Sequence, residues 1–216
     1  LRAAATAIIN TAAVSDFVPC MKDEPRALAI NSPAAAMRAV AAASPDLWWV
    51  HFSTDAVYTG APGPHIEGAA TSDATAYART KVAGEEAAAA AFPTRYVVLR
   101  SALVFGPPPF LPGTTKATPI QSMAAAFSAG NAVAAFSDEY RTPVPVEYLC
   151  RVAAACAAGL VPPRVYNCGG AARMSRVEMA AAVAAAVGGD AAALIRPQPV
   201  AAATLPYPRP PDLSME

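Results

Sequence analysis

Short apolar runs alternate with alanine-rich stretches along most of this chain, and this alternation restricts the fold more than any other feature. Apolar runs of strand length separated by helical stretches are typical of βα units and a mostly parallel sheet. Alanine is the best helix former and packs closely, so helices lying against that sheet are expected. The expected strands are residues 5–10, 48–53, 96–100 and 164–168, and the expected helices are residues 25–43, 76–91, 120–130, 146–159 and 179–187.

The boundaries between these elements carry turn and cap signals. Ser175 suits a helix N-cap, and Glu178 three residues later completes a capping box before the last helix. Residues 107–119 are rich in proline and glycine, which predicts a loop rather than a helix or strand. The tail from Pro197 onward is rich in proline and is expected to be irregular.

Length and charge exclude several classes of protein. With 216 residues, the chain is long enough for one substantial domain, or for one domain with a small appendage. Its 16 basic and 16 acidic residues give no net charge and no basic stripe, which argues against a nucleic-acid partner. No uninterrupted apolar stretch approaches the ~20 residues of a membrane span, so no membrane association is expected. The apolar run in residues 1–14 fits a strand ending at Asn10 better than a signal peptide.

The cysteines indicate neither a metal site nor a disulfide framework. None of them belongs to a CxxC pair, and no histidine lies near them at ligand spacing. Free cysteine is among the most buried residue types, so we expect buried thiols in a reducing compartment and a cytoplasmic protein that needs no metal. The residues concerned are Cys20, Cys150, Cys156 and Cys168.

Two short polar motifs bring together groups that can protonate a carbonyl. Ser53-Thr54-Asp55 follows an apolar run, and Tyr77 and Lys81 occupy positions i and i+4 of an expected helix, so they share one helix face. A nearby ammonium favours the phenolate and lowers a phenol pKa from its usual value near 10, which suits a general acid. Thr54, at the strand end, can donate a second hydrogen bond to the same carbonyl oxygen.

This set of groups predicts a site that delivers a proton to a carbonyl while a hydride is added from elsewhere. A Tyr-x-x-x-Lys pair also recurs by chance, and the alternative is a partly exposed tyrosine and a solvated lysine on an amphipathic helix. The hydroxyl-bearing strand end, 23 residues before Tyr77, favours the site.

These motifs, with several others, occur in the order seen in extended short-chain dehydrogenases/reductases, which the chain resembles over nearly its whole length. The Ser-Thr-Asp form, followed by Tyr-x-x-Thr-Lys, is similar to the dTDP-4-dehydrorhamnose reductase branch of that family. The segments that carry the resemblance are Asn10-Thr11-Ala12-Ala13, Asn31, Ser53 to Tyr58, Tyr77 to Lys81, Leu99-Arg100-Ser101, Asp138 to Pro143, Asn167 to Gly170 with Ser175-Arg176, and Arg209 to Ser214.

The resemblance implies a Rossmann-like, doubly wound parallel α/β sheet with a small C-terminal substrate-binding subdomain. Residues 1–106 would form the C-terminal part of the NAD(P)-binding domain, and residues 107–216 mainly the substrate-binding subdomain with returning Rossmann elements. The first βα units of the family, with their glycine-rich pyrophosphate turn, have no counterpart here. Because the first residue is also leucine rather than methionine, we expect a fragment that is marginally stable and binds dinucleotide poorly.

The same resemblance implies roles for particular residues. Tyr77 would donate the proton, and Lys81 would adjust the pKa of Tyr77 and hold the nicotinamide ribose. Thr54 would position the substrate carbonyl. For the alanines after the first strand the alternative is simple packing, and for Asn10 it is the closing of a turn. Cofactor contacts are implied for Asn10, Ala12, Ala13, Asn31, Ser53, Tyr77, Lys81 and Ser101.

Arg141 departs from the pattern of the bacterial sugar reductases, which tend to have a small residue before the Thr-Pro segment. In several sugar-nucleotide epimerases an arginine near this point meets the nucleotide diphosphate, so the resemblance implies a substrate-binding role for Arg141. The alternative is a surface ion pair with Asp138 or Glu139.

The favoured interpretation is an NADPH- or NADH-dependent reductase of a 4-keto-sugar nucleotide, which is dTDP-4-dehydro-L-rhamnose by family analogy. The runner-up is a non-catalytic regulatory subunit that docks on methionine adenosyltransferase in S-adenosylmethionine synthesis, because the β subunit of that enzyme is similar around Arg141 and residues 167–179. A nonfunctional fragment is the third alternative. The choice between NADPH and NADH, and the presence of a homodimer, are left open.

Overall fold

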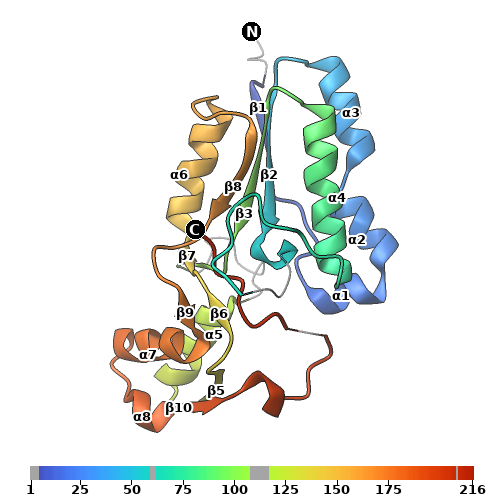
Figure 1. Cartoon of the computed structure of the whole chain (residues 1–216). Helices are drawn as coiled ribbons and strands as arrows, with labels where there is room; N and C mark the ends of the chain where they lie inside the picture. Colours follow the sequence, from blue (N-terminus) through green and yellow to red (C-terminus); the bar gives the residue numbers. More distant parts are fainter. Residues whose placement is uncertain (1–4, 59–61, 108–116, 208) are drawn as a thin grey trace.

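The computed structural model describes residues 5–58, 62–107, 117–207 and 209–216, and it contains a parallel sheet with helices on both faces (Figure 1). Four strands form this sheet, and every neighbouring pair is parallel. The α/β fold and the four expected strands are therefore confirmed. In order across the sheet, the strands are β1 (Ala7–Asn10), β2 (Trp48–Thr54), β3 (Tyr96–Ser101) and β8 (Arg164–Cys168).

The central strands β2 and β3 are apolar because both of their faces are covered, as is usual in parallel sheets. Val50, Val97 and Leu99 are buried in the main core. The register pairs Thr54 with Ser101, so the carboxyl ends of these two strands meet at one edge of the sheet. That edge is where parallel α/β sheets place their ligands.

Helices cover the two faces of the sheet unequally (Figure 1). On one face α4 (Ala76–Ala91) lies on β2 and β3, and α2 (Glu24–Asn31) and α3 (Ala34–Ala43) pack against α4. The opposite face is covered by α6 (Val146–Ala157). The many alanines allow these helices to lie close to the sheet and to one another.

The single helix expected over residues 25–43 is wrong, because the structure divides this segment into α2 and α3. Helix α2 ends before Ser32, whose backbone N–H donates to the carbonyl oxygen of Leu28. Pro33 is the N-cap of α3, and a proline lacks the N–H that a continuing helix would need. A further helix, α1 (Phe17–Lys22), precedes them and is not predicted by the sequence pattern.

The lower part of the molecule is a smaller region built from the second half of the chain (Figure 1). Helices α5 (Pro119–Ser128) and α7 (Arg176–Ala186) pack on each other. Both also contact β5 (Val133–Phe136), which pairs in parallel with β10 (Ile195–Gln198). The proline-rich tail is therefore less irregular than expected, since it starts inside a strand. The proposed division at residue 106 stays a prediction.

Short elements complete this region and connect it to the sheet. The capping box predicted at Ser175 and Glu178 is confirmed, because each side chain accepts a hydrogen bond from the backbone N–H of the other. Two-residue strands carry the chain from the sheet edge into the smaller region. The remaining elements are β4 (Val104–Phe105) paired with β7 (Val144–Pro145), β6 (Tyr140–Arg141) paired with β9 (Met174–Ser175), α8 (Ala191–Leu194), and the 3-10 turn η2 (Val200–Ala202).

Three of the four cysteines are buried as expected, but Cys150 is exposed. The buried positions of α6 are Leu149, Ala153 and Cys156, so Cys150 falls on the solvent side of the helix. Within the described ranges, no group of histidine, cysteine, aspartate and glutamate side chains could hold a metal ion. Among the residues that the structure describes, no helix is long and apolar enough to cross a membrane.

Gly84 lies inside α4, where the helix faces Asn31 of α2 and His51 of β2. A Cβ atom at this position would clash with the backbone oxygen of Asn31 and would lie 2.8 Å from Nε2 of His51. Alanine normally stabilises a helix by about 1 kcal/mol relative to glycine, but here it would push packed elements apart. We expect Gly84→Ala to lower the free energy of unfolding by about 1–3 kcal/mol in urea titrations.

Gly68→Ala is the matched control for this substitution, since a Cβ at Gly68 would meet nothing within 4 Å. It is expected to leave the unfolding midpoint unchanged or slightly raised. An unfolding midpoint for Gly84→Ala at or above that of the wild type would contradict the close approach of α4 to α2.

Candidate active site

Thr54 lies at the carboxyl end of β2, where the strand gives way to the 3-10 turn η1 (Asp55–Val57). Its Oγ1 accepts a hydrogen bond from the Ala56 N–H at 3.1 Å and donates to Asp55 Oδ1 at 3.1 Å. Burial raises the pKa of Asp55, and the nearby Arg141 guanidinium opposes that rise. The N-cap contact and the carboxylate together fix the position of the Thr54 hydroxyl.

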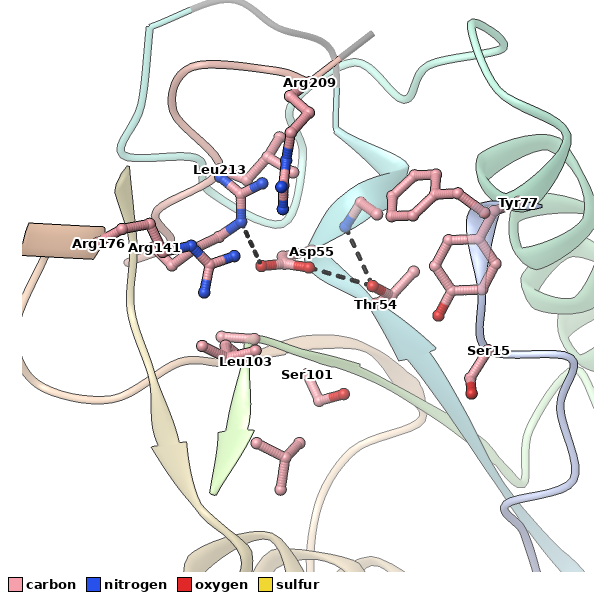
Figure 2. A pocket seen from close by; sticks show the side chains of 14 residues that line it. Ser15, Thr54, Asp55, Tyr77, Ser101, Leu103, Arg141, Arg176, Arg209 and Leu213 are labelled. Carbon is pink, nitrogen blue, oxygen red and sulfur yellow. Dashed lines mark hydrogen bonds and ion pairs between the residues drawn. The ribbon is translucent and has the colours of Figure 1, made fainter. Parts of the chain in front are cut away.

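Tyr77 lies in the first turn of α4, and its side chain faces the same space as Thr54 (Figure 2). The ring of Phe17 contacts it edge-on at 5.1 Å between centroids, and Phe17 in turn stacks on Tyr207 at 4.3 Å. The expected lowering of the Tyr77 pKa is wrong for this structure. Burial raises the pKa of the phenol, and the Thr54 hydroxyl opposes the rise only in part. A phenol is already protonated at neutral pH with its ordinary pKa near 10, and this rise moves its titration further from neutrality.

Lys81 lies one helical turn further along α4 but does not line the cavity described below. It is only 2% exposed, and its Nζ donates to the carbonyl oxygen of Phe52 at 2.5 Å. Burial lowers the pKa of Lys81 to about 8, which the carboxylate of Glu85 opposes. Since Tyr77 is also just 9% exposed, the alternative of a partly exposed tyrosine and a solvated lysine is wrong.

A cavity of about 330 Å³ opens where the sheet meets the smaller region, and it brings together residues predicted from separate parts of the chain. Thr54, Tyr77, Ser101 and Arg141 all line it (Figure 2). Ser101 Oγ donates to the carbonyl oxygen of Ser53 at 3.1 Å, which ties the two strand ends together. Side chains that the sequence did not identify also line the cavity, namely Ser15, Phe17, Asp55, Arg176, Arg209 and Leu213.

One wall of the cavity carries three arginines gathered around a fully buried carboxylate. Glu139 is 0% exposed, and its oxygens lie 2.7 Å from Arg176 Nε, 2.8 Å from Arg209 Nε and 3.4 Å from Arg141 Nη2. Arg141 Nε also lies 3.6 Å from Asp55 Oδ2. Three guanidinium groups against two carboxylates leave an excess of positive charge on this wall. Such a cluster suits an anion such as a diphosphate, because guanidinium forks match phosphate oxygens.

The ion pair expected for Arg141 exists in a different form. Arg141 pairs with Glu139, but it is 7% exposed and therefore not a surface residue. Asp138 instead accepts a hydrogen bond from the Val200 N–H at 2.8 Å. Arg176 and Arg209 were missed as site residues, although both lie in segments that carry the family resemblance. An arginine within those segments is the signal that could have identified them.

Three of the residues implied in cofactor binding lie at the end of β1, next to the cavity-lining Ser15. Ala12 and Ala13 are exposed, and their small side chains leave this strand end open. Asn10 Oδ1 accepts a hydrogen bond from the Ala12 N–H at 3.2 Å, and its Nδ2 lies 3.1 Å from His51 Nδ1. The cofactor contacts themselves stay predictions.

Asn31 and Ser53, also implied in cofactor binding, are buried and bonded to other parts of the chain. The Asn31 side chain accepts from the Val14 N–H at 2.8 Å and donates to Thr80 Oγ1 at 2.9 Å. Ser53 Oγ donates to Glu85 Oε1 at 2.5 Å. The structure thus places both residues behind the site, where they hold a loop and a strand end, and a direct cofactor contact stays a prediction.

A parallel sheet with helices on both faces and a cavity at the carboxyl ends of its strands is the arrangement of the Rossmann-like class of α/β proteins. Within that class, the chain belongs to the RmlD substrate binding domain family, whose sequence model matches residues 1–216. The dTDP-4-dehydrorhamnose reductase of Mycobacterium tuberculosis is 31% identical over 208 residues, which is 94% of this chain and 65% of that relative. The dTDP-4-keto-6-deoxy-D-glucose reductase of Streptomyces niveus is 36% identical over 102 residues, which is 47% of this chain and 35% of that relative.

Solved structures share the fold at lower sequence identity. The dTDP-4-dehydrorhamnose reductase of Yersinia enterocolitica has a TM-score of 0.85 and 20% identity, covering 98% of this chain and 72% of that structure. The enzyme of the same name from Clostridium acetobutylicum has a TM-score of 0.82 and 21% identity, covering 98% and 71%. These similarities confirm the Rossmann-like fold. The chain spans 65% or less of the length of the curated relatives given above.

Proposed function

We propose that this chain carries the proton donor and the substrate-binding residues of an NAD(P)H-dependent reductase that acts on a dTDP-linked 4-keto sugar. The observation that carries the proposal is the convergence of Thr54, Tyr77 and the arginine-rich wall on one cavity. A keto-sugar nucleotide needs a proton donor at one end of its site and an anion-binding group at the other. The cavity offers both.

Reduction of a ketone adds a hydride to carbon and a proton to oxygen. When bound, a reduced nicotinamide supplies the hydride. A phenol with its ordinary pKa near 10 is protonated at neutral pH, and burial raises the pKa of Tyr77 further. Tyr77 gives this proton to the carbonyl oxygen as negative charge develops there. Thr54 turns its hydroxyl from Asp55 to the same oxygen and stabilises that charge. The arginine wall holds the diphosphate, with Arg141 behind the more exposed Arg209.

The names of relatives support this reaction class. Both curated relatives described above are named as reductases of dTDP-linked sugars. A dTDP-4-dehydrorhamnose reductase of Bacillus anthracis with the same fold was solved in complex with NADP, and the related MoeE5 was solved with UDP-glucose and NAD. We do not propose the alternative of a methionine adenosyltransferase regulatory subunit, because no feature of the site favours it.

Binding of dTDP tests the arginine wall without requiring a cofactor. We expect Arg209→Met to weaken dTDP binding more than about tenfold in isothermal titration calorimetry, because hydrogen bonds to charged groups contribute about 1.5–3 kcal/mol. Arg151→Met, on the exposed side of α6, removes an equal charge away from this cavity and should leave the affinity unchanged. Equal affinities for the two variants would exclude the wall as the diphosphate site.

The chain by itself is expected to bind NADPH weakly. Its sequence contains no G-x-G-x-x-G or G-x-x-G-x-x-G run that could hold the pyrophosphate at a helix N-terminus. Fluorescence titration of the 216-residue chain with NADPH should therefore give a dissociation constant well above micromolar. A submicromolar constant would show that the residues present hold the whole dinucleotide.

A further inference from the structure

Glu85 is a buried carboxylate behind the site, and the reaction proposed above gives it no part. It lies on α4 one turn after Lys81 and is 6% exposed. Its Oε1 accepts a hydrogen bond from Ser53 Oγ at 2.5 Å, and the Arg100 guanidinium donates to both carboxylate oxygens at 2.6 to 3.2 Å. The Glu85 side chain therefore links α4 by hydrogen bonds to both β2 and β3.

The two partners of Glu85 are the immediate neighbours of two residues that line the cavity. Ser53 precedes Thr54, Arg100 precedes Ser101, and the register places these pairs side by side. Successive side chains of a strand point to opposite faces. Because Ser53 and Arg100 point to Glu85, Thr54 and Ser101 are directed to the cavity. The Glu85 carboxylate thus sets how both strand ends present their hydroxyls.

The same carboxylate acts on the charge of Lys81. Burial lowers the pKa of Lys81 to about 8, and Glu85 opposes this most strongly, followed by the thiol of Cys20 on α1. His51, on β2, is neutral, because burial and the lysine charge lower its pKa to about 3. Without Glu85, the Lys81 ammonium would keep its hydrogen bond to the Phe52 carbonyl. It would no longer have a carboxylate on its own helix face. Its charged form would then be less favoured.

We propose that Glu85 is a positioning residue of this site, which holds the ends of β2 and β3 against α4 and shares one face of that helix with Lys81. The role of Glu85 in catalysis rests on the proposed function. The direct consequence of the placement of Glu85, however, is a property of the chain that can be measured without turnover. A Glu85 carboxylate whose charge was fully compensated by Arg100 would leave the protonation of Lys81 unchanged.

The small number of lysines makes this consequence measurable by NMR. The chain contains Lys22, Lys81 and Lys116, so ¹³C-labelled lysine gives three Cε signals, and Lys81→Arg assigns one of them. In the wild type we expect the Lys81 signal to titrate with a pKa of about 8. In Glu85→Gln we expect its midpoint about one pH unit lower. Glu86→Gln, at the exposed neighbouring position, should leave the midpoint unchanged.

A second variant guards against loss of folding, because Glu85→Gln leaves the Arg100 guanidinium buried without its carboxylate. The double variant Glu85→Gln/Arg100→Gln removes both charges and is titrated in the same way. A smaller lowering of the Lys81 midpoint is expected there, because the loss of the positive Arg100 charge partly offsets the loss of the carboxylate. An unchanged Lys81 midpoint in either folded variant overturns the proposal, as does a wild-type midpoint near the usual ~10.4 of lysine. Since the titration uses neither NADPH nor a sugar nucleotide, a failed turnover assay would count against the proposed function alone.

Discussion

Tyr77→Phe is expected to lower kcat for the keto-sugar nucleotide by about 10²–10⁴-fold, which is the usual contribution of a positioned general acid. Phenylalanine preserves the ring that packs against Phe17 but removes the proton that the carbonyl oxygen must receive. KM and the affinity for dTDP should stay unchanged, because the proposed diphosphate site is the arginine wall. Steady-state measurement of NADPH oxidation separates the two constants.

Tyr96→Phe is the matched control, since Tyr96 lies at the start of β3, at the opposite end of the strand from Ser101. Removing its hydroxyl should leave both kcat and KM at the wild-type values. If Tyr77→Phe retained more than about a tenth of wild-type turnover, the proton would have to come from another group.

Glu139→Gln is expected to cause the largest loss of stability of any single substitution considered for this chain. The Glu139 carboxylate is 0% exposed and is shared by Arg141, Arg176 and Arg209. Removing one partner of a buried ion pair costs about 3–5 kcal/mol, because the remaining charge is left uncompensated. Urea unfolding of wild type and variant measures this loss directly.

Asp138→Asn is the control for Glu139→Gln, because it neutralises the adjacent carboxylate, whose contact with the Val200 N–H is exposed. Its cost should stay within about 1 kcal/mol. Pyrophosphate offers a second readout, since an anion in the cavity would replace the missing carboxylate. We expect it to raise the unfolding midpoint of Glu139→Gln more than that of the wild type. Equal stability of the two variants would contradict the role of Glu139 as the centre of the arginine cluster.

The sheet could be predicted from the sequence because its strands are apolar runs of sufficient length. Residues 48–54 and 96–101 are covered on both faces, which leaves an uninterrupted pattern. The break at Pro33 was missed because a proline is also compatible with the first turn of a helix, and the pattern on both sides is helical. Two-residue strands such as Tyr140–Arg141 carry no periodicity at all, and they form only through their partners.

Part of the site could be predicted because it lies in local motifs. Thr54 and Tyr77 are identified by a strand end and a helix start, and the cavity contains both. The cluster around Glu139 depends on segments more than 30 residues apart, so no local pattern reveals it. The pKa of Tyr77 was assigned the wrong direction for a similar reason. Spacing along a helix places Lys81 nearby, but only the packed structure shows how strongly burial acts on the phenol.

The most direct test of the proposed reaction is keto-sugar-dependent oxidation of NADPH, followed by the loss of NADPH absorbance. The assay uses the full-length protein. We expect oxidation that requires dTDP-4-dehydro-L-rhamnose, is lost in Tyr77→Phe and persists in Tyr96→Phe. A protein that binds both NADPH and dTDP but shows no keto-sugar-dependent oxidation would contradict the reductase function.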